Sequence, residues 1–446
     1  MSRVEKGASD ASIEHIVGML AAGERRSRRS FSFTPPENVL SPLARVPFAL
    51  DLHGRYFFDH LSEFGSWSFF GALEGGRVEQ EVLLPMLREA TGAGYVDVRP
   101  LSGLHCMTVA MAALGEVGDQ VLTVSFEAGG HLCTESLARR LGMEAVPLPM
   151  GNAHDLDLDR VEEVVAELRP AAIYVDQSSE LFPIDPAPLR EIVERRSPQT
   201  LIHYDASHLN GLILTGAMFN PLARGAHSLG GSTHKTLPGP HKGYLATDDP
   251  RLAARFAASA STFVSHHRIA DVVSLAITMI ELRDCGGDEY GRLVIENARR
   301  FAHGLDRAGV AVSAAERGFT DCHQVWVPAP AGSDPVALAN RLFEAGLVVN
   351  KLDGLPGVAG TAFRFSLAEL TRMGGGVEEV DELSSILAEV LLERDARGIA
   401  ERVGALRSRL REPRYCYGPD DLAALGAPEE IVDLCRTMAG LHRATR

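Results

Sequence analysis

The feature that most constrains the fold is a regular alternation of short apolar runs and helical stretches between residues 95 and 205. Nearly continuous apolar runs predict strands that are buried on both faces, and the stretches between them have helical spacing. Such βαβ units build a mostly parallel sheet that helices cover on both sides, so we expect an α/β fold. The predicted strands are Tyr95–Leu101, Gln120–Phe126, Glu144–Pro149, Ala171–Asp176 and Thr200–Tyr204.

Polar residues follow several of these predicted strands. Asp205 and His208 come just after one strand, Ser102 comes after another, and Asp176 ends a third. Open α/β sheets bind their ligands beyond the carboxyl ends of the strands. The sequence therefore predicts a functional site at this edge of the sheet.

Lysine is scarce in this chain, which has four lysines (Lys6, Lys235, Lys242 and Lys351) against forty arginines. An amine that can lose its proton differs chemically from a guanidinium that cannot. Lys235 lies in the glycine-rich segment G-G-S-T-H-K-T-L-P-G-P-H-K-G-Y, thirty residues after Asp205, which leaves room for one more strand. We predict that Lys235 is a nucleophile that forms a Schiff base with a carbonyl cofactor.

The cofactor that fits this set is pyridoxal 5'-phosphate. Asp205 would keep the ring nitrogen protonated, which makes the ring an electron sink. Ser102 and Gly103, where a strand leads into a helix, would offer backbone amides to the phosphate. His131, after two glycines, would cover the ring. Plainer interpretations remain open, since Ser102 can simply cap a helix and His131 can simply begin one.

Other site chemistries fit the sequence less well. Asp205 and His208 have the spacing of two metal ligands, but no third ligand follows at a suitable distance, so we expect no metal. The segment G-G-S-T-H does not match the G-x-S-x-G turn of a serine hydrolase. Three other histidines, His266, His267 and His323, are interpreted as ordinary polar surface residues.

Composition narrows the class of protein. A net charge of −15 argues against a nucleic-acid or anionic-membrane partner. The basic segment Glu24–Arg29 is interpreted as a solvated helix end. No apolar run is long enough to span a bilayer and no signal peptide is visible, so we expect a cytoplasmic protein. The six cysteines form no C-x-x-C pair, which gives no indication of a disulfide framework or a zinc site.

At 446 residues the chain exceeds the usual size of a single core. We predict an N-terminal arm over residues 1–55, Pro-rich and irregular after a first helix, a large cofactor-binding domain over residues 56–308, and a small C-terminal α+β domain over residues 309–446. Strands are expected at Val310–Ala314, His323–Pro328, Val348–Asn350 and Ala362–Phe365. From Glu378 the chain is expected to be helical with one break, at R-E-P-R-Y-C-Y-G.

Several motifs resemble those of the serine hydroxymethyltransferase family of fold-type I pyridoxal phosphate enzymes. They are D-A-S-H-L-N-G-L, S-T-H-K-T-L-P-G-P-H-K-G-Y, P-E-N, R-P-L-S-G, G-G-H-L, F-R-F-S and L-T-R-M-G, and they occur in the family order over most of the chain. The lysine segment is highly specific. The resemblance implies an aspartate-aminotransferase-like fold and a homodimer with its sites at the subunit interface.

Catalytic roles follow from the resemblance residue by residue. It implies Lys235 as the Schiff-base lysine, Asp205 at the pyridinium nitrogen, His131 stacked on the ring and His208 near the phenolic oxygen. Arg364 would bind the substrate carboxylate, a task that suits its planar, bidentate donors.

The resemblance also implies further cofactor contacts. Ser102, Gly103 and Leu104 would lie at the phosphate, Ser178 would make a polar contact, and His234 would stand beside the lysine.

Three departures from the family pattern put folate dependence in question. Phenylalanines stand where the family has tyrosines in F-F-D-H-L-S-E-F-G-S-W-S-F-F-G, Pro36 replaces a serine, and F-V-S-H-H-R replaces a glycine-rich phosphate segment. Together with P-G-P-x-K-G-Y and G-F-T-D-C-H-Q-V, these departures resemble atypical relatives of secondary metabolism and antibiotic biosynthesis. These relatives are threonine transaldolases and the lincosamide-pathway enzymes that process a sulfur-linked cysteine.

The expected activity is chemistry at Cα or Cβ of a β-substituted α-amino acid. The leading hypothesis is retro-aldol and aldol transfer of the threonine transaldolase type, a transferase reaction that begins with a lyase-like cleavage. Alternatives are β-elimination or decarboxylation-dependent deamination of an S-substituted cysteine, and tetrahydrofolate-dependent serine hydroxymethyl transfer. An inactive, partner-binding paralogue is the alternative from a different class.

Overall fold

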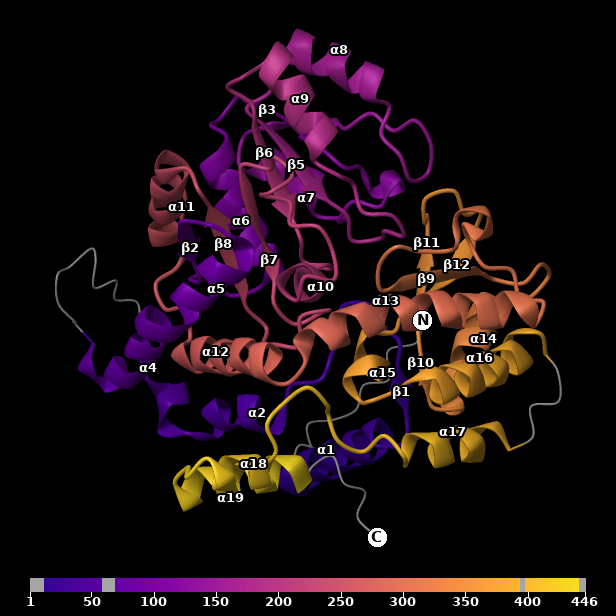
Figure 1. Ribbon diagram of the computed structural model, residues 1–446. Coiled ribbons are helices and arrows are strands. Elements are labelled where there is room, and N and C mark those ends of the chain that lie inside the picture. Colours follow the sequence, from indigo (N-terminus) through magenta and orange to yellow (C-terminus); the bar gives the residue numbers. More distant parts are fainter. Residues whose placement is uncertain (1–11, 58–68, 394–397, 441–446) are drawn as a thin grey trace.

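A computed structural model describes residues 12–57, 69–393 and 398–440. Its central element is a seven-stranded sheet in the order β2-β8-β7-β6-β5-β3-β4, shown in Figure 1. The run β7-β6-β5-β3-β4 is parallel, while β8 is antiparallel to both of its neighbours. The strands are β2 (Tyr95–Asp97), β3 (Gln120–Thr123), β4 (Glu144–Pro147), β5 (Ala172–Asp176), β6 (Leu201–Asp205), β7 (Ser228–Ser232) and β8 (Gly243–Thr247). The predicted α/β class is confirmed.

Both faces of this sheet are buried, as the continuous apolar runs predicted. On β5, Ile173 and Val175 pack into one hydrophobic core, while Tyr174 points into the other. The second of these cores is covered by α6 and α11, which pack against each other. The helices around the sheet are α4 (Leu73–Val78), α5 (Leu84–Thr91), α6 (Gly103–Leu114), α7 (Thr134–Arg140), α8 (Leu158–Leu168), α9 (Ala187–Arg196), α10 (Asn210–Leu214), α11 (Pro250–Phe263) and α12 (Ile269–Asp284).

A second, three-stranded sheet lies beyond α13 (Gly287–Arg307). Figure 1 shows α12 and α13 running one after the other, with α13 reaching the smaller sheet. This sheet has the antiparallel order β11-β12-β9, and α16 packs against α13 beside it. Its elements are β9 (Gln324–Pro328), α14 (Pro335–Glu344), β11 (Asn350–Asp353), β12 (Thr361–Ser366), α15 (Ala368–Arg372) and α16 (Val377–Leu391).

Residues 31–33 of the N-terminal part pack onto this second region, whereas α2 (Pro42–Ala49) packs against α12. Strand β1 (Phe31–Ser32) pairs in parallel with β10 (Leu347–Val348). Phe31 and Phe33 are buried in the same hydrophobic core as β9 and β12. The division into an arm and two domains stays a prediction.

Three local predictions were wrong. The stretch before residue 55 is not irregular, because Ser41 caps helix α2 (Pro42–Ala49) and Pro42 occupies its first turn, where proline needs no amide partner. Val310–Ala314 is not a strand, because Ala314 turns into the left-handed region. The C-terminal part has more than one break, between α16, α17 (Ile399–Arg407), α18 (Pro419–Ala424) and α19 (Glu429–Gly440).

One further prediction falls mostly outside the described residues, and another is confirmed. The segment F-F-D-H-L-S-E-F-G-S-W-S-F-F-G, which begins at Phe57 and differs from the family pattern, falls mostly on residues 58–68. These residues lie outside the described part of the chain. The first predicted helix is α1 (Ile13–Ser27). Within the described ranges, no helix is long and apolar enough to cross a membrane.

Candidate active site

The carboxyl ends of β5, β6 and β7 meet at one edge of the sheet and surround a cavity of about 280 Å³. The strand register pairs Asp176 with Asp205, and Asp205 with Gly230, which brings the ends of the three strands level. Nine of the ten predicted site residues line this cavity: Ser102, Gly103, Leu104, His131, Ser178, Asp205, His208, His234 and Lys235. The tenth, Arg364, lies beside it. Their functional roles remain predictions.

Lys235 lies in the loop after β7, and this loop is fixed by polar contacts. The amide Nδ2 of Asn38 donates to the carbonyl of Lys235 at 2.6 Å, and the hydroxyl of Tyr290 donates to the carbonyl of Thr236 at 2.7 Å. Burial lowers the pKa of Lys235 to about 8, although the nearby Asp205 raises it. The neighbouring Lys242 instead donates its amine to the carbonyl of His267 at 2.7 Å, outside the cavity. Of these two lysines, Lys235 is therefore the one that lines the cavity.

Asp205 is held by two donors. The hydroxyl of Tyr174 donates to Oδ2 at 3.0 Å, and the amide of Ser207 donates to Oδ1 at 3.0 Å. Gly231 passes close to this carboxylate with φ of +127°, and a Cβ there would stand 2.8 Å from Oδ1. Because Gly231 has no side chain, the carboxylate of Asp205 can keep its position beside it. The role of Tyr174 was not predicted, because only the register of β5 against β6 brings it to Asp205.

The start of α6 forms one end of the cavity. Ser102 caps the helix by accepting from the amide of His105 at 3.2 Å, so it does cap, as the plainer interpretation held. The amides of Gly103 and Leu104 have no acceptor among the described residues, and helix N-termini favour anions. A Cβ on Gly103 would stand 2.8 Å from Cβ of Ser232, so only glycine allows this approach.

His131 precedes α7 and is fixed through Asp176. The carboxylate Oδ2 of Asp176 accepts from the amide of His131 at 3.1 Å and from the hydroxyl of Thr134 at 2.5 Å. The amide of Cys133 donates to Nδ1 of His131 at 3.2 Å, so the neutral ring carries its proton on Nε2. Burial, followed by the charge of Lys235, lowers the pKa of His131 and favours that neutral form.

Arg364, on β12 of the smaller sheet, reaches the rim of the cavity. One guanidinium nitrogen, Nη1, donates at 2.8 Å to both the carbonyl of Ser178 and the hydroxyl of Ser179, and Nε donates to Asn350 at 3.0 Å. Burial lowers the pKa of Arg364 to about 10, which leaves it cationic at neutral pH. Its Nη2 has no hydrogen-bond partner among the described residues and remains open to a carboxylate.

Two histidines were wrongly expected at the surface. His323 is completely buried, and its Nε2 lies 3.3 Å from Nδ1 of His208. His267 is completely buried as well, with Nε2 at 2.7 Å from a carboxylate oxygen of Glu79. The sequence around these histidines does not reveal their burial, because their partners His208 and Glu79 are distant in the sequence. His234, beside Lys235, stacks on His241 with ring centroids 3.9 Å apart, and burial lowers its pKa to about 3.

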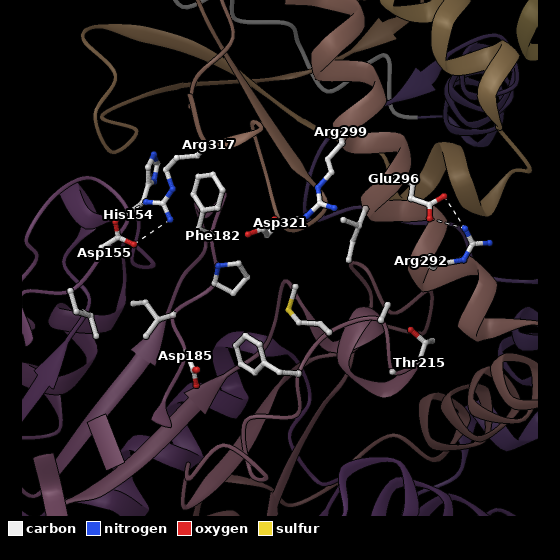
Figure 2. Close-up of a pocket in the computed structure, with 18 of the residues that line it drawn as sticks. His154, Asp155, Phe182, Asp185, Thr215, Arg292, Glu296, Arg299, Arg317 and Asp321 are labelled. Carbon is white, nitrogen blue, oxygen red and sulfur yellow. Dashed lines mark hydrogen bonds and ion pairs between the residues drawn. The ribbon is translucent and has the colours of Figure 1, made fainter. Parts of the chain in front are cut away.

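A larger cavity of about 940 Å³ lies elsewhere, between the loop after β5 and α13, and is shown in Figure 2. Its charged groups are largely paired with one another. Arg317 binds Asp155 and stacks 4.0 Å above the ring of Phe182, and Arg292 binds Glu296. Arg299 pairs with Asp321. Since this cavity has no comparable nucleophile, the smaller one is the candidate active site.

The residues of the smaller cavity fit pyridoxal phosphate. An amine with a lowered pKa, a carboxylate for the ring nitrogen, an imidazole and free helix amides all face one space. The serines Ser207 and Ser232 also line it, and they were missed although they lie within the D-A-S-H and S-T-H-K motifs. Ser178 was expected to make a polar contact with the cofactor. In the structure its backbone carbonyl accepts a hydrogen bond from Arg364, which the sequence did not indicate.

Comparisons with known proteins identify the family of the chain. Residues 73–251 match the family model "Serine hydroxymethyltransferase". An L-threonine:uridine-5'-aldehyde transaldolase of Streptomyces sp is 36% identical, over 91% of this chain and 97% of the relative. A serine hydroxymethyltransferase of Pyrobaculum arsenaticum is 32% identical, over 92% and 95%. The crystal structure of an L-threonine transaldolase from Pseudomonas fluorescens in its internal aldimine state shares the fold, with a TM-score of 0.82 at 23% identity over 93% and 96%.

Proposed function

Because the chain belongs to the serine hydroxymethyltransferase family of pyridoxal-phosphate-dependent enzymes, we propose that it is a threonine transaldolase. The observation that carries this proposal is that a transaldolase relative spans nearly the whole chain at higher identity than the hydroxymethyltransferase relative. In the proposed reaction the Cα–Cβ bond of L-threonine breaks and acetaldehyde leaves. The remaining glycyl unit forms a new Cα–C bond to an acceptor aldehyde, and the hydroxyl proton lost by threonine returns to the new hydroxyl group.

Pyridoxal phosphate, when bound, supplies an electron sink that stabilises negative charge on Cα of the amino acid. Lys235 can take up and return a proton at Nζ near neutral pH, because burial lowers its pKa to about 8. Asp205, held by Tyr174 and Ser207, would bind the ring nitrogen of the cofactor. Arg364 offers Nη2 to the α-carboxylate of threonine.

The acceptor is proposed to be a nucleoside-type aldehyde, with uridine-5'-aldehyde as the first one to test, because the transaldolase relatives that span most of this chain act on it by name. The start of α6 would hold the cofactor phosphate, so its amides would not be available to a charged group of the acceptor.

The test is a substrate panel with the purified holoenzyme. L-Threonine with uridine-5'-aldehyde is expected to release acetaldehyde, and Lys235→Ala is expected to abolish this release. Formation of glycine from L-serine that requires tetrahydrofolate would instead identify a hydroxymethyltransferase. Pyruvate or an aldehyde formed from an S-substituted cysteine would identify the thioether chemistry, and either result without threonine turnover refutes the proposal.

We further propose a cytoplasmic homodimer. The apolar face of α1 supports the dimer, because Ile13, Val17 and Leu20 are all more than half exposed and no residue of this helix is buried. Light scattering is expected to give twice the mass of the chain, and a monomer at micromolar concentration contradicts the dimer.

A further inference from the structure

A stacked pair of histidines connects the cavity with the smaller sheet. The rings of His208 and His323 are nearly parallel, with an interplanar angle of 22° and centroids 5.4 Å apart. Nδ1 of His208 lies 3.3 Å from Nε2 of His323. His208 lines the cavity, whereas His323 does not, so His323 acts on the site only through its neighbour.

The backbone around His323 is fixed on both sides. The amide of Asp321 donates to the carbonyl of Leu181 at 2.8 Å, and the thiol of Cys322 donates to the carbonyl of Glu180 at 3.3 Å. After His323, its carbonyl accepts from the amide of Leu367 at 3.2 Å. These contacts fix the backbone position from which the ring of His323 reaches His208.

Both rings are neutral at working pH. Burial, followed by the charge of Lys235, holds the pKa of His208 well below its usual value. Burial, followed by the charge of Arg364, does the same for His323. His131 faces the pair from the cavity side, and the carboxyl of Glu180, whose pKa burial raises, lies near Lys235 and Arg364. Two neutral rings share one proton between the facing nitrogens, so one ring must donate and the other accept.

The free nitrogen of His323 decides which ring donates. Nδ1 of His323 is buried and has no hydrogen-bond partner among the described residues. If His208 donated, this Nδ1 would be a buried N–H without an acceptor, and orphaned buried N–H groups are the rarer and costlier kind. If His323 donates through Nε2, only a lone pair is left unmatched. The second arrangement is favoured.

We propose that His323 is a positioning residue that donates Nε2–H to Nδ1 of His208 and so fixes the tautomer in which His208 presents Nε2–H to the cofactor cavity. This assignment concerns the bound cofactor and does not depend on which amino acid or aldehyde is the substrate. The family resemblance implies that His208 lies near the phenolic oxygen of the cofactor. A fixed donor there would draw charge from that oxygen and would weaken its hold on the proton shared with Lys235.

The test is a pH titration of the visible absorbance of the holoenzyme without any amino acid. His323→Leu removes the donor, and we expect its midpoint to rise by about 0.5 unit or more, which corresponds to roughly a threefold change in proton affinity. His323→Gln places an amide N–H near the position of Nε2, and its midpoint is expected to stay within about 0.2 unit of the unchanged protein. His303→Leu, an exposed histidine on α13, controls for the loss of a ring.

A second pair of variants covers the case in which the leucine variant does not fold. His323→Asn carries an amide that reaches only the position of Nδ1, so its midpoint is expected to rise as in the leucine variant, while the glutamine variant does not shift. The proposal is overturned if the glutamine variant shifts as far as the leucine or asparagine variant. It is also overturned if none of the three changes the midpoint.

Discussion

The lowered pKa of Lys235 has a direct kinetic consequence. Burial lowers this pKa from 10.5 to about 8, so at pH 7 roughly a tenth of the amine is neutral, about 300 times the fraction of an unperturbed lysine. The neutral amine is the form that attacks an aldehyde. We expect the rate constant for incorporation of pyridoxal phosphate into the cofactor-free protein to rise about fivefold from pH 7 to pH 8 and to level off above about pH 8.5. Stopped-flow absorbance measures it.

Two variants test this prediction further, and one outcome would contradict it. Asp205→Asn removes the charge that raises the pKa of Lys235 most, so the midpoint should move below that of the unchanged protein. Lys235→Ala should show no covalent incorporation. A rate that keeps rising about tenfold per pH unit up to pH 10, as an unperturbed lysine would give, refutes the reasoning that burial tunes this amine.

Three further substitutions test the geometry of the site. Tyr174→Phe removes a hydrogen-bond donor to the buried Asp205, worth about 1.5–3 kcal/mol for a charged acceptor, and should lower the midpoint of thermal unfolding. The control is Tyr204→Phe, which should leave the midpoint unchanged because the hydroxyl of Tyr204 has no hydrogen-bond partner among the described residues. Equal midpoints for the two variants contradict this prediction. Arg364→Lys should raise the KM for threonine about tenfold or more while the visible absorbance of the cofactor persists; an unchanged KM opposes its carboxylate role. Gly231→Ala would set a Cβ 2.8 Å from Oδ1 of Asp205 and should weaken cofactor binding about tenfold or more in equilibrium dialysis. The control Gly216→Ala is also at positive φ, but its Cβ would lie in open space, so this variant should bind the cofactor as the unchanged protein does. Equal affinities of the two variants argue against the close approach at Gly231.

Much of the large sheet could be predicted because its strands are buried on both faces and are therefore nearly continuous apolar runs. The helices around it could be predicted from apolar residues at helical spacing. The predicted strands Ala171–Asp176 and Thr200–Tyr204 are observed as β5 (Ala172–Asp176) and β6 (Leu201–Asp205). The failed strand at Val310–Ala314 shows the limit. Val310 and Val312 are buried as a strand would bury them, but only Ser313 donates to β9, at the carbonyl of Trp326, before Ala314 reverses the chain. Apolar alternation predicts burial, whereas a strand also requires a continuous ladder.

The candidate site divides in the same way. Asp205 and Lys235 could be predicted because strand ends in a parallel sheet converge, and adjacent strands β6 and β7 bring them together. Tyr174 and His323 could not, since each acts through a partner that lies far away in sequence. Tyr174 depends on strand register, and His323 depends on how the smaller sheet packs against the loop after β5.

The enzyme is proposed to transfer the glycyl unit of threonine to another aldehyde in the cavity that Lys235 lines. The most direct measurement uses L-threonine labelled with ¹³C at Cα, together with uridine-5'-aldehyde, and follows the label by mass spectrometry. We predict that the label appears in a new β-hydroxy-α-amino acid in equal amount to the acetaldehyde released, and that Lys235→Ala gives neither. Release of acetaldehyde with the label only in glycine, or no cleavage of threonine at all, would contradict the account.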